Sequence, residues 1–301
     1  MDSQILSAAD EADILTVTAP LAPLVPVVFA SPHSGADYPA SFVAASRLDP
    51  SSLRRSEDSF VDELFASAPA HGAPLLAAKF PRAFVDANRE PYELDPAMFS
   101  GPLPPQANIR SPRVAAGLGT IARVVASGAE IYRDKLPVAE AERRIERYYR
   151  PYHARLSGLV EGARERFGWC LVVDCHSMPS VGGPCDRDKG TTRVDVVLGD
   201  CFGGSCMPPI AQAASETFLR LGYRVVRNTP YAGGFTTRQY GRPGHGYQSL
   251  QIELNRALYM DEATHRKNAN FARLAADLEQ VVAALTAAAL TATDSDRLAA
   301  Q

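Results

Sequence analysis

The sequence predicts an α/β fold, a three-layer α/β/α sandwich in which helices cover both faces of a mixed, mostly parallel central sheet. The first observation is that strand-like and helix-like segments alternate along the chain, which is typical of such sheets. The second is that several strand-like segments are apolar throughout, as expected when both faces of a sheet are covered. The chain has 301 residues, 46% of them hydrophobic, and no internal repeat, so we expect one domain over residues 1–301.

The predicted strands are short runs rich in apolar and β-branched residues. Two of them lie in the stretches "VPVVFASPHSG" and "CLVVDCHSMPS", where a histidine follows the apolar run. The full set is Val25–Ala30, Pro74–Ala78, Ala83–Val85, Cys170–Asp174, Arg193–Leu198, Tyr223–Arg227 and Ser249–Leu254.

The predicted helices connect these strands. Ser56 is placed to cap a helix over Glu57–Ser67, and Pro151 predicts a break in a longer helix over Val138–Phe167. The other two are Pro208–Leu221 and Asp261–Ala289, the latter in one piece or two. The Pro- and Gly-rich segment 91–119 is interpreted as a surface insertion or lid, and residues 292–301 as a flexible tail.

Composition argues against several classes of partner. The net charge of −3 and the isoelectric point near 6.1 show no electrostatic footprint for nucleic acid. The acidic N-terminus has no apolar core flanked by basic residues, and the chain has no long uninterrupted apolar run. We therefore expect a cytoplasmic protein that binds a small molecule and has no membrane partner. The sequence leaves its oligomeric state open.

Two histidines follow predicted strands, and this position indicates a metal site. In open parallel sheets, ligands bind beyond the carboxyl ends of the strands, where His33 and His176 would meet in one crevice. Either histidine alone is better explained as a turn residue, whereas the pair favours a metal centre. A catalytic zinc ion usually takes three protein ligands and water. The third ligand would be Glu57 or Asp58, although their position is equally well explained by the dipole of the predicted helix.

Other polar residues cluster near strand ends. Arg82 precedes a predicted strand, and Asn88 and Arg89 follow it, which suggests an anionic substrate. Glu253 lies on the polar side of the alternating segment "SLQIELNR". A carboxylate beside a metal can accept a proton from water, although a strand glutamate can equally be paired with an arginine.

Six motifs occur in order over residues 25–260: "SPHSG", "SEDSFVDELF", "FVDANRE", "VDCHSMP", "PYAGGFTTRQYGRP" and "LQIELNR". This set resembles the N-formylglutamate amidohydrolase family. The resemblance implies zinc-dependent hydrolysis of N-formyl-L-glutamate to formate and L-glutamate, late in histidine breakdown. It also implies a fold similar to that of zinc carboxypeptidases and aspartoacylase-like deacylases. Other divalent metals could replace zinc in such a site.

The resemblance further implies roles for individual residues. Glu253 would be the general base and then the acid, and Arg82 would stabilise the tetrahedral intermediate. The zinc ligands would be His33, His176 and Asp58, with Glu57 as the alternative acid. The residues that bind the substrate carboxylates would be Asn88, Arg89, Arg133, Thr236 and Arg238.

One position departs from the family pattern. Family members often have a histidine before the last motif, where this chain has Gln248, and His245 lies three residues earlier. The alternatives to formylglutamate hydrolysis are therefore a deacylase of another N-acyl amino acid and a non-catalytic metal- or amino-acid-binding protein on the same scaffold.

Overall fold

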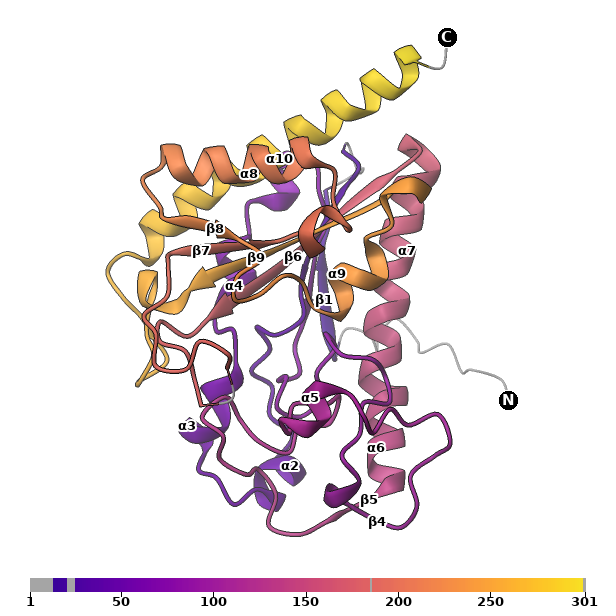
Figure 1. Cartoon of the computed structure of the whole chain (residues 1–301), viewed down its shortest axis with the longest axis vertical. Helices are drawn as coiled ribbons and strands as arrows, with labels where there is room; N and C mark the ends of the chain where they lie inside the picture. The colour runs from indigo at the N-terminus through magenta and orange to yellow at the C-terminus, as the bar shows by residue number, and fades with distance from the viewer. Residues whose placement is uncertain (1–12, 21–24, 185, 300–301) are drawn as a thin grey trace.

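A computed structural model describes residues 13–20, 25–184 and 186–299, with only the helical backbone described over residues 293–299. Its central sheet has seven strands in the order β1-β3-β2-β6-β9-β7-β8 (Figure 1). These strands are β1 Leu15–Thr18, β2 Val27–Ser31, β3 Leu75–Ala78, β6 Cys170–Met178, β7 Val196–Gly199, β8 Val225–Arg227 and β9 Tyr247–Asn255. Two small two-stranded sheets pair β4 Phe99–Ser100 with β5 Leu136–Pro137, and β10 Met260–Asp261 with β11 Arg266–Lys267.

The sheet is mixed and mostly parallel, as predicted. Strands β3, β2, β6 and β9 run parallel to one another. The edge strand β1 is antiparallel to β3, and the parallel pair β7–β8 joins β9 in the antiparallel sense. Strand β1 was not predicted. The predicted strand Ala83–Val85 is wrong, because Phe84 and Val85 both donate backbone hydrogen bonds to Pro81 and form a turn.

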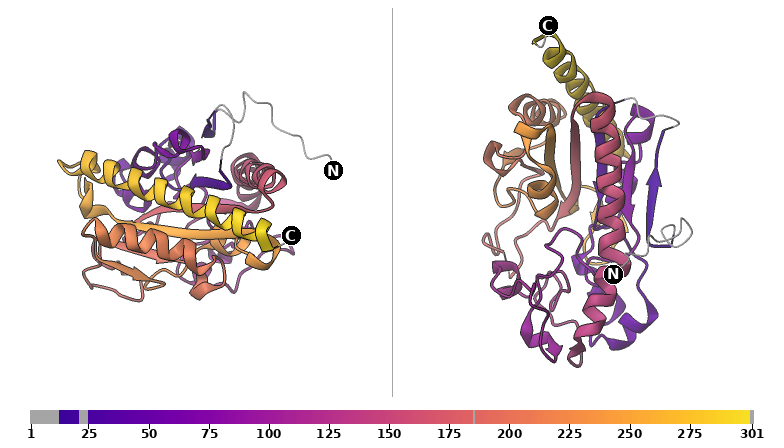
Figure 2. Two further views of the ribbon diagram at one scale, coloured as in Figure 1. Left: turned by 90° about the horizontal axis from the view of Figure 1, so that it is seen from above. Right: turned by 90° about the vertical axis from the view of Figure 1, so that its right-hand side faces the viewer.

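The helices are α2 Ala40–Ala45, α3 Pro50–Leu53, α4 Val61–Leu64, α5 Pro112–Ala115, α6 Val138–Arg144, α7 Arg150–Phe167, α8 Pro208–Arg220, α9 Phe235–Tyr240 and α10 Phe271–Ala299. In Figure 1, α8 and α10 lie together above the sheet, and α7 runs down its right-hand side. The right-hand view of Figure 2 shows the first strands of the chain on one side of α7 and the later strands on the other. This places α7 over the middle of the sheet, where it contacts β2 and β6.

The side chains of the central strands alternate between two hydrophobic clusters, because successive residues of a strand point to opposite faces. In β6, Cys170 and Val172 pack with the side chains of α7, whereas Leu171 and Val173 pack with those of α4, α8 and α10. Both faces of the sheet are thus covered by apolar side chains of other elements, which explains why the strands are apolar throughout. In β6, the polar residues Asp174, His176 and Ser177 follow the apolar run Leu171–Val173.

Two predicted helices begin later than expected. Helix α4 begins at Val61 rather than Glu57, because Glu57 is extended and the backbone N–H of Asp58 donates to His33 O instead of joining a helix. Ser56 does not cap a helix, and its hydroxyl accepts from the backbone N–H of Ala126. Helix α10 begins at Phe271, since the preceding residues form the β10–β11 hairpin.

The predicted break at Pro151 is also wrong. A π-helical turn over Ile145–Tyr149 joins α6 to α7, and the N–H of Arg150 donates to Ile145 O across it. Pro151 directly follows this widened turn, which accommodates a residue without an N–H inside a continuous helix. The helical rod therefore continues through the proline. The helix predicted over Pro208–Leu221 is confirmed as α8.

Helix α10 is long and apolar enough, over Phe271–Ala292, to cross a membrane by length and composition. Its apolar residues Leu274, Leu278 and Leu285 are buried in the cluster that also contains side chains of α8. The same composition is therefore accounted for by packing against the body of the protein. The predicted flexibility of the tail 292–301 remains a prediction; residues 300–301 lie outside the described part of the chain.

The segment 91–119 crosses the surface beside the pocket described below. Its two ends are tied together, since Thr120 N donates to Glu93 O at 2.9 Å. Gly119 allows this approach, because a Cβ atom there would lie 2.2 Å from the same oxygen. Closure of this segment as a lid remains a prediction.

Candidate active site

Strand alternation brings the polar residues of the site to one face of the sheet. In β6 the apolar residues Cys170 and Val172 are followed on the same face by Asp174 and His176. The neighbouring strand β9 pairs Glu253 with His176 in parallel register, so the two side chains leave the same face. The sequence prediction that histidine and glutamate meet at the strand ends is consistent with this register.

His33, Asp58 and His176 form a buried triad. The Nδ1 atoms of the two histidines are 3.1 Å apart. Asp58 Oδ2 lies 3.4 Å from Nδ1 of His33 and 3.1 Å from Nδ1 of His176. The three residues come from three separate segments: the turn after β2, the loop before α4, and β6.

A second carboxylate lies behind each histidine. His33 Nε2 is 2.7 Å from Asp86 Oδ1, and His176 Nε2 is 2.9 Å from Asp174 Oδ1. When Nε2 of a neutral His33 donates to Asp86, its Nδ1 carries a lone pair. His176 Nε2 also lies 3.0 Å from Asn88 Nδ2, so it is shared between a carboxylate and an amide. Metal-binding histidines in proteins are held in this way, with the remote nitrogen hydrogen-bonded to a carboxylate.

The triad fits a divalent metal ion. Two imidazole nitrogens and one carboxylate oxygen are the ligand set of many catalytic zinc sites. In a tetrahedral site with metal–ligand bonds of about 2.0–2.1 Å, ligand atoms are about 3.3 Å apart. The separations of 3.1 Å, 3.1 Å and 3.4 Å in the triad match this spacing. Burial alone would lower the pKa of His176, but Asp174 and Asp58 raise that pKa well above its usual range, so the cluster attracts positive charge.

Charge around Asp58 keeps it ionised. Burial alone would raise its pKa, but the contacts with the two histidines, with Arg82 and with Arg256 hold that pKa well below its usual range. Arg256 Nη2 donates to Asp58 Oδ1 at 2.8 Å, on the oxygen that does not face the histidines. Asp58 therefore presents a charged Oδ2 to the centre of the triad.

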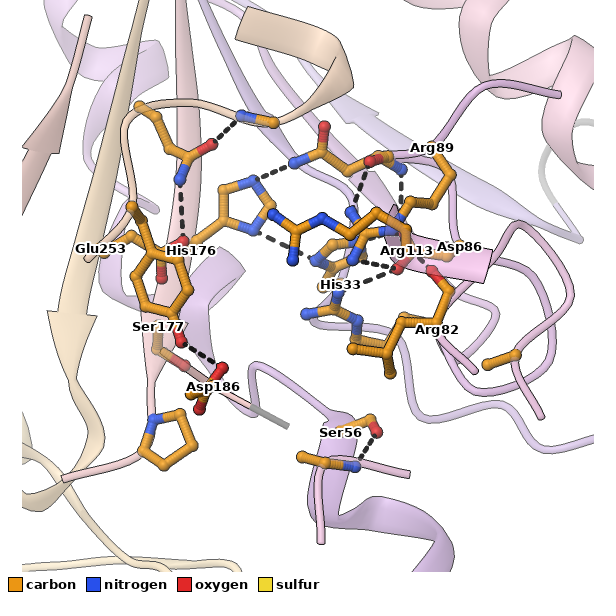
Figure 3. Close-up of a pocket in the computed structure, with 18 of the residues that line it drawn as sticks. His33, Ser56, Arg82, Asp86, Arg89, Arg113, His176, Ser177, Asp186 and Glu253 are labelled. Carbon is orange, nitrogen blue, oxygen red and sulfur yellow. Dashed lines mark hydrogen bonds and ion pairs between the residues drawn. The ribbon is translucent and has the colours of Figure 1, made fainter. Parts of the chain in front are cut away.

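Glu253 lines the same pocket as the triad residues His33 and His176 (Figure 3). Its Oε1 accepts a hydrogen bond of 2.9 Å from Gln251 Nε2, and Gln251 is itself held by the backbone N–H of Gly234. Burial raises the pKa of Glu253 to about 7. A carboxyl group with that pKa can accept and release a proton near neutral pH.

Three of the predicted polar residues line the pocket: Arg82, Asn88 and Arg89. Arg82 Nη2 donates to Asp86 at 2.8 Å. Asn88 links two parts of the site, since its Oδ1 accepts from Thr236 N and its Nδ2 donates to Asp174 Oδ2. Arg89 is buried, and its guanidinium donates to the carbonyl oxygens of Leu118 and Asn88.

The structure does not bring three other predicted substrate-binding residues into this pocket. Thr236 is buried at the start of α9 and contributes its backbone N–H to Asn88. Arg238 is exposed and donates to Gly233 O. Arg133 lies in a different hollow with Arg47 and donates to Ser46 O. The pocket that contains the triad is lined by none of the three.

Two alternatives left open by the sequence can be placed. Glu57 points away from the triad and pairs with Arg54 at 2.8 Å, so Asp58 is the acid that meets the histidines. Gln248 lies near the amino end of β9, where its Oε1 accepts from Met207 N, and His245 is exposed in the preceding turn. Neither Gln248 nor His245 lines the pocket, so the departure from the family pattern does not alter it.

Several residues of the site were not predicted. Asp174 could have been found, because it is two residues before His176 in a strand and must share its face. Asp86 lies within the motif "FVDANRE", but nothing in the sequence indicates that it contacts His33. Arg113 lies in the segment 91–119, which was predicted as a surface insertion or lid and not as part of the site. The unpredicted pocket residues also include Tyr231, Asp186, Gln251 and Arg256.

An α/β fold with a buried His–Asp–His triad and a buried glutamate at one end of its parallel strands defines a protein with a candidate metal centre. Comparison with known proteins identifies the family. The profile of the family described as N-formylglutamate amidohydrolase matches residues 25–260. The chain belongs to this family.

Individual relatives agree with that assignment. The N-formylglutamate deformylases of Pseudomonas putida and Pseudomonas aeruginosa are 27% and 30% identical to it over 241 and 246 residues, covering 79% of this chain and 83% of each relative. The crystal structure of N-formylglutamate amidohydrolase from Ralstonia eutropha is 39% identical, with a TM-score of 0.84 over 93% of this chain and 99% of that one. A gene product of Agrobacterium tumefaciens, 22% identical, shares the fold with a TM-score of 0.64 over 93% and 98%.

Proposed function

We propose that this protein hydrolyses the formyl amide of N-formyl-L-glutamate, giving formate and L-glutamate, with a divalent metal ion at the triad. The observation that carries the proposal is that both histidines of the buried triad line one pocket together with the buried Glu253. The names of the Pseudomonas and Ralstonia relatives support the choice of substrate. The proposal includes zinc as the native metal, a role in histidine breakdown and a cytoplasmic location.

His33, Asp58 and His176 would hold the metal, each orienting one ligand atom toward the others. When bound, a zinc ion supplies Lewis acidity and lowers the pKa of water to about 7. Asp86 would keep the His33 ring in the orientation and tautomer that ligation needs, and Asp174 and Asn88 would orient the His176 ring. Asp58 would remain charged because Arg256 is bonded to its other oxygen.

Glu253 would move the protons of the reaction. It takes one proton from the water that attacks the formyl carbon and then donates that proton to the nitrogen as the C–N bond breaks. Arg82 lines the same pocket and would stabilise the negative charge that develops on the formyl oxygen. Preorganised donors of this kind contribute roughly 3–4 kcal/mol to transition-state stabilisation.

The remaining parts of the proposal concern the fold and the residues that bind the substrate. We place the chain in one domain with a three-layer sandwich of the zinc-carboxypeptidase type, because helical side chains cover both faces of its mixed sheet. Asn88 and Arg89 would hold the α-carboxylate of the substrate from the wall of the pocket. The roles of Arg133, Thr236 and Arg238 in substrate binding remain predictions, and none of the three lines the pocket.

The test is the release of formate from N-formyl-L-glutamate, measured as purified, after treatment with a chelator, and after zinc is added back. We expect the activity to disappear with the chelator and to return with zinc. Activity that survives complete metal removal would contradict the metal-dependent mechanism. N-formyl, N-acetyl and longer N-acyl derivatives of other amino acids serve as competing substrates, and a clear preference for one of these would indicate the deacylase alternative.

A further inference from the structure

The pocket that contains the triad is lined by the guanidinium groups of four arginines, three of which have partners within the protein. Arg256 donates to Asp58, Ser177 and a backbone carbonyl. Arg82 pairs with Asp86, and Arg89 is bonded to two backbone carbonyls. The fourth is Arg113, which differs from them in being exposed.

Within the described chain, the guanidinium of Arg113 forms no hydrogen bond or ion pair. Only the backbone N–H of this residue is engaged, with the Ser111 hydroxyl that caps α5. An arginine that lines a pocket without a partner keeps its five N–H donors for a ligand. In Figure 3, Arg113 lies with Arg82, Arg89 and Asp86 on one side of the pocket, opposite Glu253 and His176.

The position of Arg113 is set by contacts at the base of its segment. Arg89 Nε donates to Leu118 O at 2.8 Å, so the segment that carries α5 is fastened to the wall of the site. Val114, next to Arg113, is buried in the protein. The side chain of Arg113 is therefore presented at the pocket by an anchored helix turn rather than by a free loop.

Two like charges lie near each other on this side. Burial lowers the pKa of Arg89 to about 10, and the positive charge of Arg113 acts in the same direction. Arg89 is compensated by Asp86, whose Oδ2 lies 3.5 Å from Arg89 Nη2, while Arg113 has no such carboxylate. An anion bound between them would relieve this repulsion, and a carboxylate matches the planar guanidinium in shape.

We propose that Arg113 is a specificity-determining residue that binds the side-chain carboxylate of a dicarboxylic N-acyl amino acid. The assignment rests on the proposed function. Arg89 is buried beside Asp86, which contacts the triad residue His33, so it suits the α-carboxylate next to the scissile nitrogen. Arg113 stands at the exposed rim and suits the carboxylate at the far end of the substrate.

The experiment compares N-formyl-L-glutamate with N-formyl-L-glutamine, in which the side-chain carboxylate is replaced by a neutral amide. We expect Arg113→Gln to raise KM for N-formyl-L-glutamate roughly 10- to 100-fold with kcat changed much less, because ground-state binding of a charged group is lost. For N-formyl-L-glutamine the same variant should behave as the unmodified protein does. An equal loss on both substrates would overturn the proposal.

Two further variants separate charge from geometry and from position. Arg113→Lys keeps the charge but not the planar donor pair and should recover only part of the affinity. Arg110→Gln removes the same charge from the same segment at an exposed position that does not line the pocket, and it should leave KM unchanged. A rise in KM of equal size in Arg110→Gln would show a general field effect and would overturn the role of Arg113.

Calorimetric binding of L-glutamate and L-glutamine to the zinc-loaded protein keeps this inference distinguishable from the proposed function. If the unmodified protein fails to release formate but binds L-glutamate through Arg113, the proposed reaction fails and the carboxylate site stands. If it releases formate and Arg113→Gln binds L-glutamate as tightly as before, the reaction stands and the role of Arg113 is wrong.

Discussion

At the scale of the residue, both ring nitrogens of each triad histidine have polar contacts. Nδ1 of His33 faces another imidazole and a carboxylate, while its Nε2 is bonded to Asp86. When Nε2 of His33 donates to Asp86, its Nδ1 presents a lone pair to the centre of the triad, as a metal ligand must. The carboxylate behind the ring is therefore part of the candidate metal site.

Asp86→Asn tests that relation. The neutral amide is a weaker acceptor for His33 Nε2–H and can also turn its NH₂ group toward the ring, so the tautomer needed for ligation is no longer favoured. We expect zinc affinity to fall about 10- to 100-fold, measured by competition with a chromogenic chelator. Asp195→Asn, which removes a carboxylate paired with surface Arg224, is the control and should bind zinc normally. Unchanged affinity in Asp86→Asn would rule out the orienting role.

Glu253→Gln tests the proton-transfer role. The amide cannot accept a proton, so turnover should fall about 10²- to 10⁴-fold, while zinc binding is retained because Glu253 is not one of the triad. Formate release and zinc content are measured on the same preparation. Glu216→Gln, an exposed change on α8, is the matched control and should keep full turnover. Substantial turnover in Glu253→Gln would eliminate this residue as the base.

The sequence was informative about the residues that follow strands and uninformative about their partners. His33 and His176 could be predicted to share a crevice, because the carboxyl ends of parallel strands meet at one edge of a sheet. The contact of Asp86 with His33 could not, since it depends on the turn at Pro81 and on the backbone bond from Asp86 N to Thr120 O. Spacing along the chain carries no information about such a long-range hydrogen bond.

At the scale of the element, α7 supports the loop that carries Asp86, Asn88 and Arg89. Tyr149, at the end of the π-helical turn, donates its hydroxyl to Arg89 O at 2.7 Å. His153, one turn further, lies 2.8 Å from Ala87 O through its Nε2. The sequence predicted a helix here but also a break at its proline, because the rule about the missing N–H takes no account of a widened turn. That turn places both side chains against the loop.

His153 should make the stability of the protein depend on pH. Burial lowers its pKa to about 4, whereas a histidine in the unfolded chain has a pKa near 6.5. Between these values the unfolded state binds more protons, so the contribution of His153 is complete above about pH 6.5 and is lost as the pH falls toward 4. Acidification from pH 7.5 to 5 should therefore cost about 2 kcal/mol through this residue.

The measurement is urea unfolding at both pH values, for the unmodified protein and for His153→Gln. Glutamine can donate to Ala87 O but does not titrate, so the variant should lose about 2 kcal/mol less on acidification. His71→Gln, at an intermediate position near the surface, is the comparison for a histidine outside this loop support. An identical loss in the unmodified protein and in His153→Gln would show that His153 contributes nothing to the pH dependence.

At the scale of the whole molecule, the triad joins three parts of the chain that are far apart in sequence. His33 follows β2, Asp58 precedes α4, and His176 lies near the carboxyl end of β6. Hydrophobic patterning could predict β2 and β6 but not the loop of Asp58, which is shaped by bonds to His33 O and to Arg256. A bound metal would therefore link three segments of the chain that belong to different elements. Its binding free energy would add to the stability of the folded state.

This leads to a prediction about thermal unfolding. A ligand that binds only the folded state at about 100 times its Kd adds about 2.7 kcal/mol. For a chain somewhat larger than 250 residues, this corresponds to a rise in Tm of roughly 5 °C. We expect that rise when zinc is added to the metal-free protein, and no rise in Asp58→Ala or His176→Ala, measured by calorimetry at equal free zinc.

Glu57→Ala removes the neighbouring carboxylate that pairs with Arg54 instead of the triad, so its zinc-induced shift should be retained even if its baseline Tm is lower. A shift of the same size in the triad variants would place the zinc ion elsewhere on the protein.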